Sequence, residues 1–130
     1  MTAHEPRWLT RRIVDALHDV LIDEHGGSHG TRDAALIESA LARPINRFSY
    51  EEADLADLAA AYAFGLVKNH GYVDGNKRVG LGALLLFLRR NGFKVQMDEA
   101  EAVLSIEELA VGGLAELELA HWLRARMYAV

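Results

Sequence analysis

Two runs without a charged residue constrain the fold of this chain most. They cover Leu58–Val67 and Val79–Leu88, and each is ten residues long. A bilayer span needs about 20 apolar residues, so these runs are too short for that role. They suit helices inside a small domain, and helices that are apolar on nearly all sides belong at the centre of a fold. The sequence therefore predicts an all-α helical bundle built around two buried central helices.

Amphipathic segments around the two runs predict the other helices. Thr10 can cap a first helix that runs to about Glu24, and Asp54 can cap the first apolar helix. Pro44 should end the second helix, because proline pushes the preceding residue out of the helical region. The helices expected from caps, apolar spacing and glycine stops cover residues 11–24, 33–42, 55–69, 78–91, 99–111 and 116–127. With no linker or repeat in sight, we expect one domain over residues 1–130.

Two stretches have no clear period. Residues 45–53 read INRFSYEEA and are expected to be an extended segment or a loop. Residues 93–98 read FKVQMD and are either a brief strand or an extended connector. Residues 25–30, HGGSHG, hold three glycines, which end the first helix and make a flexible loop.

Composition narrows the function classes. The net charge is −5 and the pI about 5.6, which argues against a general nucleic-acid binder. Residues 1–12 lack the apolar core of a secretory signal, and neither apolar run is long enough to span a bilayer. The chain has no cysteine, so a reducing cytoplasm is the expected location.

The polar segment between the apolar helices, HGYVDGNKR at His70–Arg78, carries the chemistry. Histidine is the side chain best suited to moving protons near neutral pH. The carboxylate of Asp74 could bind a divalent metal, or orient or deprotonate a hydroxyl. Gly75 allows close approach of a ligand to the backbone. These groups suit phosphoryl or nucleotidyl transfer.

The start of the following helix is a candidate anion site. Asn76, Lys77 and Arg78 stand there, where free N–H groups and the positive end of the helix dipole attract anions. Two cations at this end cost about 0.3–1 kcal/mol each when exposed. A bound anion between them would offset that cost. The alternative is an ordinary polar turn with solvated cations, which explains less well why five polar groups stand between two apolar helices.

At this point the sequence resembles the signature of the Fic/Doc superfamily, roughly HxFx(D/E)(G/A)N(K/G)R. The match is closest to the Doc, or death-on-curing, branch. Other stretches are similar to that branch as well, namely HGGSHGTRD with LIESALARP, AAAYAFGLVKNH, LLLFLRRNGFKV and ELAHWL. The resemblance covers about residues 10–127 and implies an all-α fold with this loop between two central helices.

The resemblance also implies an activity. Most Fic relatives transfer AMP from ATP to a hydroxyl of a target protein, and they usually have glycine where this chain has Lys77. The lysine variant is typical of Doc toxins, which resemble protein kinases and phosphorylate a threonine of elongation factor Tu, halting translation. Lysine fills space and adds charge where nucleotide phosphates would lie. We therefore expect phosphoryl transfer from ATP with Mg²⁺, and AMP transfer is the alternative.

Residue roles follow from the resemblance by position. His70 would be the general base for the target hydroxyl, and Asp74 would bind Mg²⁺ or position that hydroxyl. Lys77 and Arg78 would complete the catalytic set. The phosphate-binding set would be Gly75, Asn76, Lys77, Arg78 and Lys68, of which the last is the weakest candidate.

Departures from the family pattern bear on how well the loop is organised. Gly71 replaces a proline or branched residue and is expected to loosen the loop. Tyr72 replaces phenylalanine, so its hydroxyl needs a partner. No segment matches the self-restraining helix of some Fic proteins, (S/T)xxxE(G/N). The resemblance therefore implies a Phd-like antitoxin whose C-terminal helix lies in a groove. An inactive relative that only binds such an antitoxin is a further alternative.

Two other features each have two interpretations. Residues 45–53 correspond either to the flap that pairs with targets in Fic-like enzymes or to an ordinary connecting loop. The histidines at 18, 25 and 29, with Asp23 and Glu24, fit no standard zinc spacing. For these histidines we favour a structural or flexible loop over a metal site.

Overall fold

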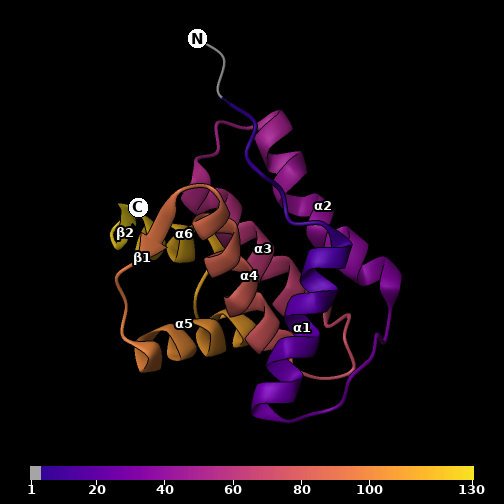
Figure 1. The fold of residues 1–130 in the computed structure, drawn as a ribbon. Helices are drawn as coiled ribbons and strands as arrows, with labels where there is room; N and C mark the ends of the chain where they lie inside the picture. The colour runs from indigo at the N-terminus through magenta and orange to yellow at the C-terminus, as the bar shows by residue number, and fades with distance from the viewer. Residues whose placement is uncertain (1–3) are drawn as a thin grey trace.

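The computed structural model describes residues 4–130. Within them the chain forms six helices and two short strands (Figure 1). The elements are α1 (Arg11–His25), α2 (Ala34–Tyr50), α3 (Leu55–Asn69), α4 (Asn76–Arg90), β1 (Phe93–Val95), α5 (Glu99–Val111), α6 (Glu116–Arg124) and β2 (Met127–Ala129). The fold is all-α apart from the small sheet, as the sequence predicts.

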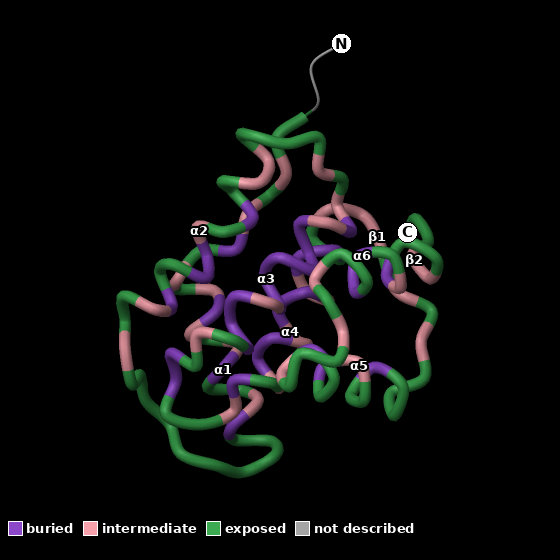
Figure 2. The backbone as a smooth tube through the Cα atoms, turned by 180° about the vertical axis from the view of Figure 1, so that it is seen from behind, coloured by how far each residue is buried: buried purple, intermediate pink, exposed green. Residues whose placement is uncertain are grey.

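The antiparallel neighbours α3 and α4 form the centre of the bundle. Helices α1 and α2 cover one side of this pair, and α5 and α6 cover the other (Figure 1). Ten of the fifteen residues of α3 are buried, and the buried segments concentrate along α3 and α4 in Figure 2. The prediction of two central apolar helices is confirmed. The motif loop, residues 70–75, therefore connects the two most deeply buried helices.

Helix starts follow the capping residues that the sequence indicated. The Thr10 side chain accepts a hydrogen bond from the N–H of Ile13 at the start of α1. Asp54 and Asp57 form a reciprocal capping box at the start of α3. The capping residues thus place the starts of α1 and α3 where we predicted them.

Helix α2 differs from the prediction, because it continues through Pro44 to Tyr50. Pro44 leaves the carbonyl of Ala40 without its helical partner. Ala40 lies against α3 in close contact, because a Cβ placed on Gly65 of α3 would be only 2.9 Å from the Ala40 Cα. Residues 45–50, expected to be extended or a loop, are helical. The expectation of an extended segment or a loop is therefore met only at residues 51–53.

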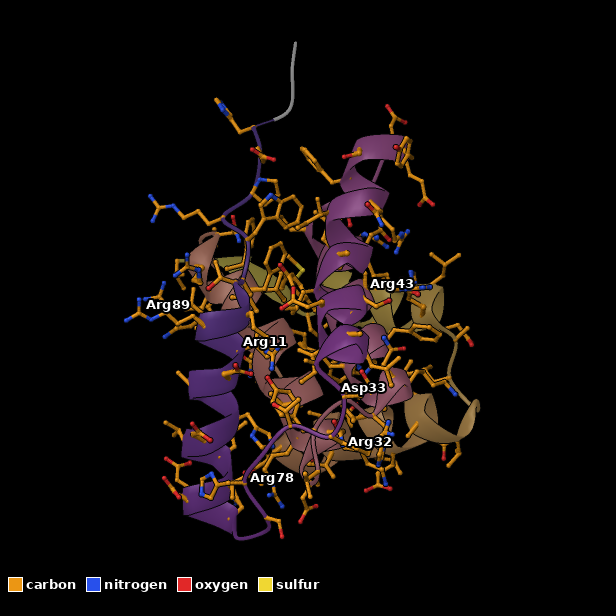
Figure 3. All side chains as sticks on the ribbon, turned by 90° about the vertical axis from the view of Figure 1, so that its right-hand side faces the viewer. Arg11, Arg32, Asp33, Arg43, Arg78 and Arg89 are labelled. Atoms are coloured by element: carbon orange, nitrogen blue, oxygen red, sulfur yellow. The ribbon has the colours of Figure 1, made fainter. Side chains whose placement is uncertain are left out.

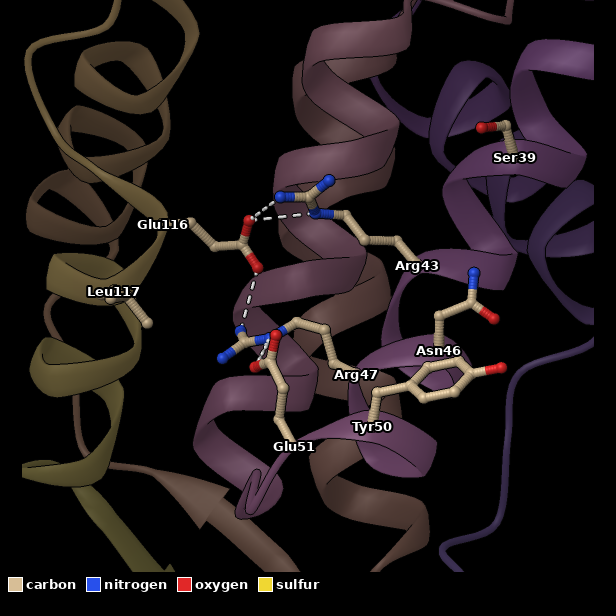
Figure 4. Close-up of a pocket in the computed structure, with 8 residues that line it drawn as sticks. All are labelled: Ser39, Arg43, Asn46, Arg47, Tyr50, Glu51, Glu116 and Leu117. Carbon is tan, nitrogen blue, oxygen red and sulfur yellow. Dashed lines mark hydrogen bonds and ion pairs between the residues drawn. The ribbon is translucent and has the colours of Figure 1, made fainter.

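Tertiary ion pairs explain why α2 persists beyond the proline. Arg43 and Arg47 share the carboxylate of Glu116 at the start of α6, with N–O distances of 2.5 and 3.0 Å (Figure 4). Arg47 also donates to the carbonyl of Asp57 in α3. The side chains of Arg47 and Glu116 are only 15% and 11% exposed, so solvent screens this pair less than a surface pair. These contacts favour the helix over the local preference of proline.

The end of the chain also differs from the prediction. Helix α6 ends at Arg124 rather than near Met127, and residues 127–129 form β2. This strand pairs antiparallel with β1, with Phe93 opposite Ala129. The N–H of Gln96 donates to the carbonyl of Arg126, so pairing gives partners to backbone groups at both strands. The segment FKVQMD thus starts as a strand, one of the two alternatives.

No helix in the described residues is both long and apolar enough to cross a membrane.

Candidate active site

The motif loop joins α3 to α4 at one end of the bundle, and its polar groups line one pocket. The pocket has a volume of about 550 Å³ and lies between the loop, the start of α4 and α5. Its lining includes His70, Asp74, Gly75, Asn76, Lys77 and Arg78 from the loop and α4, with Glu99, Val103 and Glu107 from α5. Every residue of the predicted set except Lys68 lines this pocket.

The start of α4 presents backbone N–H groups and positive side chains, an arrangement that favours an anion. Gly75 precedes the helix with φ +75°, in the left-handed region that glycine adopts without strain. No side chain caps the first turn of α4, and no acidic residue stands in it. Helices α5 and α6 also lack a side-chain cap, but each has two glutamates in its first turn. Uncapped N–H groups at a helix start point outward with the positive end of the dipole. The side chains of Lys77 and Arg78 add positive charge at the same place.

His70 is held in an unusual backbone conformation at the end of α3. Its φ of 56° and ψ of 46° make it the one residue other than glycine with positive φ among residues 4–130. Arg32 donates from Nε to the His70 carbonyl at 2.8 Å and from a second nitrogen to the Asn69 carbonyl. The imidazole is left exposed and free of hydrogen bonds to the described residues. Strain at a residue that is held by its surroundings is typical of functional sites.

Arg32 is a residue that the sequence interpretation missed. It comes from the segment between α1 and α2, and it reaches the same end of the bundle as Arg78 (Figure 3). Its guanidinium also neutralises the negative carbonyl end of α3. No local pattern marks this arginine, because the partner carbonyls are 37 and 38 positions away.

The carboxylate of Asp74 is exposed toward the pocket and held by two backbone N–H groups. Gly75 donates to Oδ1 at 2.9 Å, and Ser28 donates to Oδ2 at 3.2 Å. Ser28 belongs to the glycine-rich loop, which we expected only to be a flexible connector. Arg78 donates to the Gly26 carbonyl of the same loop. The glycine-rich loop therefore forms part of the site through its contacts with Asp74 and Arg78, which no sequence pattern indicated.

The net charge of the side chains that line the pocket indicates whether a nucleotide would need a metal ion to bind there. The carboxylates of Asp74, Glu99 and Glu107 outnumber the cations Lys77 and Arg78 by one. Lys77 already pairs with Glu107 at 3.3 Å. A polyphosphate entering such a pocket needs a further positive charge. Mg²⁺ is commonly bound by one or two carboxylates together with substrate phosphates, so this donor set fits a nucleotide that arrives with Mg²⁺.

Asn76 and Lys68 have other contacts in the structure. Asn76 is buried, and its side chain closes the loop by accepting from the N–H of Tyr72 and donating to the carbonyl of the same residue. Its backbone N–H, rather than its amide, remains for a ligand. Lys68 is exposed and donates to the Ala110 carbonyl of α5, outside the lining of the pocket.

The departures at Gly71 and Tyr72 have structural explanations. A Cβ on Gly71 would overlap Ile37 Cγ1 and lie 3.1 Å from the Ile37 nitrogen. The Gly71 carbonyl accepts from the N–H groups of Arg32 and Asp33. Our expectation of a loosened loop is wrong, because glycine here allows the loop to pack tightly on the start of α2. The Tyr72 hydroxyl finds its partner in Asp15 at 2.5 Å, and burial together with that carboxylate raises the pKa of Tyr72.

The three histidines that could have been metal ligands lie in different environments. His29 bridges Asp19 and Asp23 at 3.0 and 2.8 Å. His18 is buried beneath the motif loop, whereas His25 lines the pocket. A group of three or more His, Cys, Asp or Glu residues placed to hold a metal is not found in residues 4–130.

A second pocket of about 560 Å³ lies between α2 and α6 (Figure 4). Its two arginines are paired with the carboxylates of Glu116 and Glu51, and none of the motif residues reaches it. Its lining holds no proton-transfer group comparable to His70. The motif pocket is therefore the candidate active site.

Comparison with known proteins shows which family the chain belongs to. The family model described as the Fic/DOC family matches residues 8–88, which include the whole motif loop. The chain is 38% identical over 123 residues to "Protein kinase doc" of Escherichia phage P1, covering 94% of this chain and 96% of that protein. It is 40% identical over 75 residues to "Toxin Doc" of Mycolicibacterium smegmatis, covering 56% and 58% of the two chains. The chain thus belongs to the Fic/DOC family.

Proposed function

We propose that this protein is a Doc-type toxin that transfers the terminal phosphoryl group of ATP to a hydroxyl of a target protein. One observation carries the proposal. An exposed histidine, an oriented carboxylate and an uncapped helix start with two cations meet in one pocket. The similarity to a protein named "Protein kinase doc" over nearly its full length supports phosphoryl transfer rather than another reaction of the family.

The residues divide the work as follows. His70 accepts the proton of the target hydroxyl as its oxygen forms a bond to the γ-phosphorus. The bond from that phosphorus to the β–γ bridging oxygen breaks, and ADP leaves with the electron pair. Lys77, Arg78 and the N–H groups at the start of α4 hold phosphate oxygens, where negative charge must be stabilised.

Asp74 would hold Mg²⁺ together with the phosphates. The metal would supply positive charge that stabilises the negative charge of the phosphates. The hydrogen bonds from Gly75 and Ser28 to the carboxylate set the direction in which its remaining lone pairs point. Lys77 pairs with Glu107 at 3.3 Å, and a bound phosphate would take the place of Glu107.

Elongation factor Tu is the proposed target, and a Phd-like antitoxin is the proposed inhibitor. The likeness to two proteins named Doc supports both, as an inference from the family. A translation factor as target would place the reaction in the cytoplasm.

AMP transfer by the same loop is the second candidate, because it is the usual reaction of Fic relatives. Lys77 favours phosphoryl transfer, since its side chain takes up room and adds charge in the pocket. Mass spectrometry of elongation factor Tu after incubation with ATP, Mg²⁺ and this protein separates the two. A gain of one phosphoryl group supports the proposal, and a gain of AMP refutes it.

The inactive alternative needs a different experiment. His70→Ala and Lys77→Ala should each abolish growth arrest in cells while preserving the fold, which circular dichroism would verify. Lys68→Ala is the matched control, because Lys68 lies outside the pocket. If the folded His70 and Lys77 variants arrest growth as strongly as the wild type, catalysis by this loop is excluded.

A further inference from the structure

Apart from tyrosines, two polar side chains are buried in the part of the chain that the structure describes, and both hold the motif loop. One is Asn76, directly after the loop. The other is His18, which comes from α1 and is 2% exposed. Its Nε2 lies 2.7 Å from the carbonyl oxygen of Asp74. Burying a polar ring costs free energy unless it is hydrogen-bonded, so this contact is what makes histidine tolerable here.

The direction of this hydrogen bond is fixed by its acceptor. A carbonyl oxygen only accepts, so the proton must sit on Nε2 of His18, which donates it. The ring of His18 also stacks on Tyr72, with centroids 4.0 Å apart and an interplanar angle of 11°. The ring therefore has one orientation, and its N–H is aimed at the peptide between Asp74 and Gly75.

That peptide links His18 to the reactive carboxylate. A trans peptide is planar, and its C=O and N–H point in opposite directions. When His18 holds the carbonyl of Asp74 inward, the N–H of Gly75 must point the other way. This N–H donates to Oδ1 of Asp74 at 2.9 Å. The orientation of the buried ring is thus passed through one rigid peptide to the carboxylate that faces the pocket.

We propose that His18 is a positioning residue that sets the direction of the Asp74 carboxylate through the Asp74–Gly75 peptide. Its effect on catalysis rests on the proposed function, whereas its effect on the loop does not. The pocket contains no part of His18, so the histidine acts without touching substrate or metal.

Two substitutions of His18 distinguish the role of its N–H donor from the role of its ring, which packs on Tyr72. His18→Phe keeps a flat ring for Tyr72 but removes the donor. His18→Gln keeps an amide donor that reaches about as far as Nε2 but removes the ring. Loss of an outer partner of a metal-binding group typically costs about 10–100-fold in metal affinity or activity. We expect such a loss in His18→Phe, and a loss of only a few-fold in His18→Gln.

The loss should also have a distinct form. Electron paramagnetic resonance measures the free Mn²⁺ concentration at which half of the protein has bound metal in the presence of ATP. This concentration should rise in His18→Phe together with the fall in kcat. His121→Phe is the matched control, because His121 is exposed on α6. Equal behaviour of the Phe and Gln variants, or wild-type activity and Mn²⁺ affinity in His18→Phe, overturns the proposal.

A third measurement is independent of any activity. NMR should show faster hydrogen exchange of the Gly75 amide in His18→Phe than in His18→Gln, because that N–H loses its fixed partner. If the wild type transfers no phosphate, the proposed function fails, and the exchange rates alone decide the role of His18. If His18→Phe does not fold, His18→Asn replaces it, since its donor is one bond too short.

Discussion

Gly71→Ala tests whether the motif loop is packed as tightly on α2 as the structure shows. The added Cβ would overlap Ile37 Cγ1 and lie 3.1 Å from the Ile37 nitrogen and 3.2 Å from the Asp33 oxygen. The two polar atoms belong to the backbone at the start of α2, which cannot move as the end of a flexible side chain can. The loop or the helix must shift instead.

The magnitude follows from two opposing effects. Overpacking a tight site costs about 1–3 kcal/mol. Gly71 does not have positive φ, so alanine is compatible with its backbone conformation. The smaller entropy of the unfolded chain then returns about 0.4–1 kcal/mol. We expect a net destabilisation of about 1–2 kcal/mol, which lowers Tm by about 3–10 °C for a domain of this size.

The assay is urea unfolding followed by circular dichroism, together with the rate of phosphoryl transfer. Gly82→Ala is the matched control, because its Cβ would meet only the side-chain ends of Leu17 and Leu21. We expect that control to be neutral or slightly more stable. The cost of Gly71→Ala should shrink in an Ile37→Ala background, where the overlapping atom is absent.

Equal stability of Gly71→Ala and Gly82→Ala would refute the argument. So would a cost that is unchanged when Ile37 is alanine. Either result would mean that the loop is free to yield, and that Gly71 loosens it as the sequence alone suggested.

Three further predictions concern the surroundings of the site. Arg32→Ala should slow phosphoryl transfer more than tenfold with little change in the KM for ATP, since the arginine holds the backbone of His70 and not the nucleotide; a matching rise in KM alone would contradict this role. Tyr72→Phe should lower the free energy of unfolding by about 1.5–3 kcal/mol in urea titrations, because it removes a hydrogen bond to a charged group, Asp15; an unchanged midpoint would count against that bond. The carboxylates of two α1 aspartates raise the pKa of His29, so its hold on the glycine-rich loop is complete below pH 6.5 and is lost as pH rises through the higher folded pKa. NMR order parameters of residues 26–30 should be lower above the raised pKa of His29 than below pH 6.5, and they should not respond to pH in His29→Gln.

Much of the fold could be predicted from local patterns. The start of α3 is marked by Asp54, and α5 has the bounds that its acidic start and glycine stop indicate. These features depend on neighbours within one helical turn, so a short window of sequence contains the information.

The errors lie where distant contacts outweigh local preference. Pro44 predicts a helix end, yet Arg47 continues α2 by binding Asp57 and Glu116, 10 and 69 positions away. The last helix gives way to β2 because a strand partner is available in β1. Neither partner is visible in the local sequence.

For the site, the sequence by itself determined which reactive groups share one short segment of the chain. His70, Asp74, Lys77 and Arg78 lie within nine residues, so any fold that joins two helices there brings them together. Only the tertiary structure decided how they are held. His18 meets the Asp74 carbonyl from 56 positions away, and the glycine-rich loop reaches the carboxylate from 46. Such contacts depend on how α1 packs against α4, which is a property of the whole core and of no single segment.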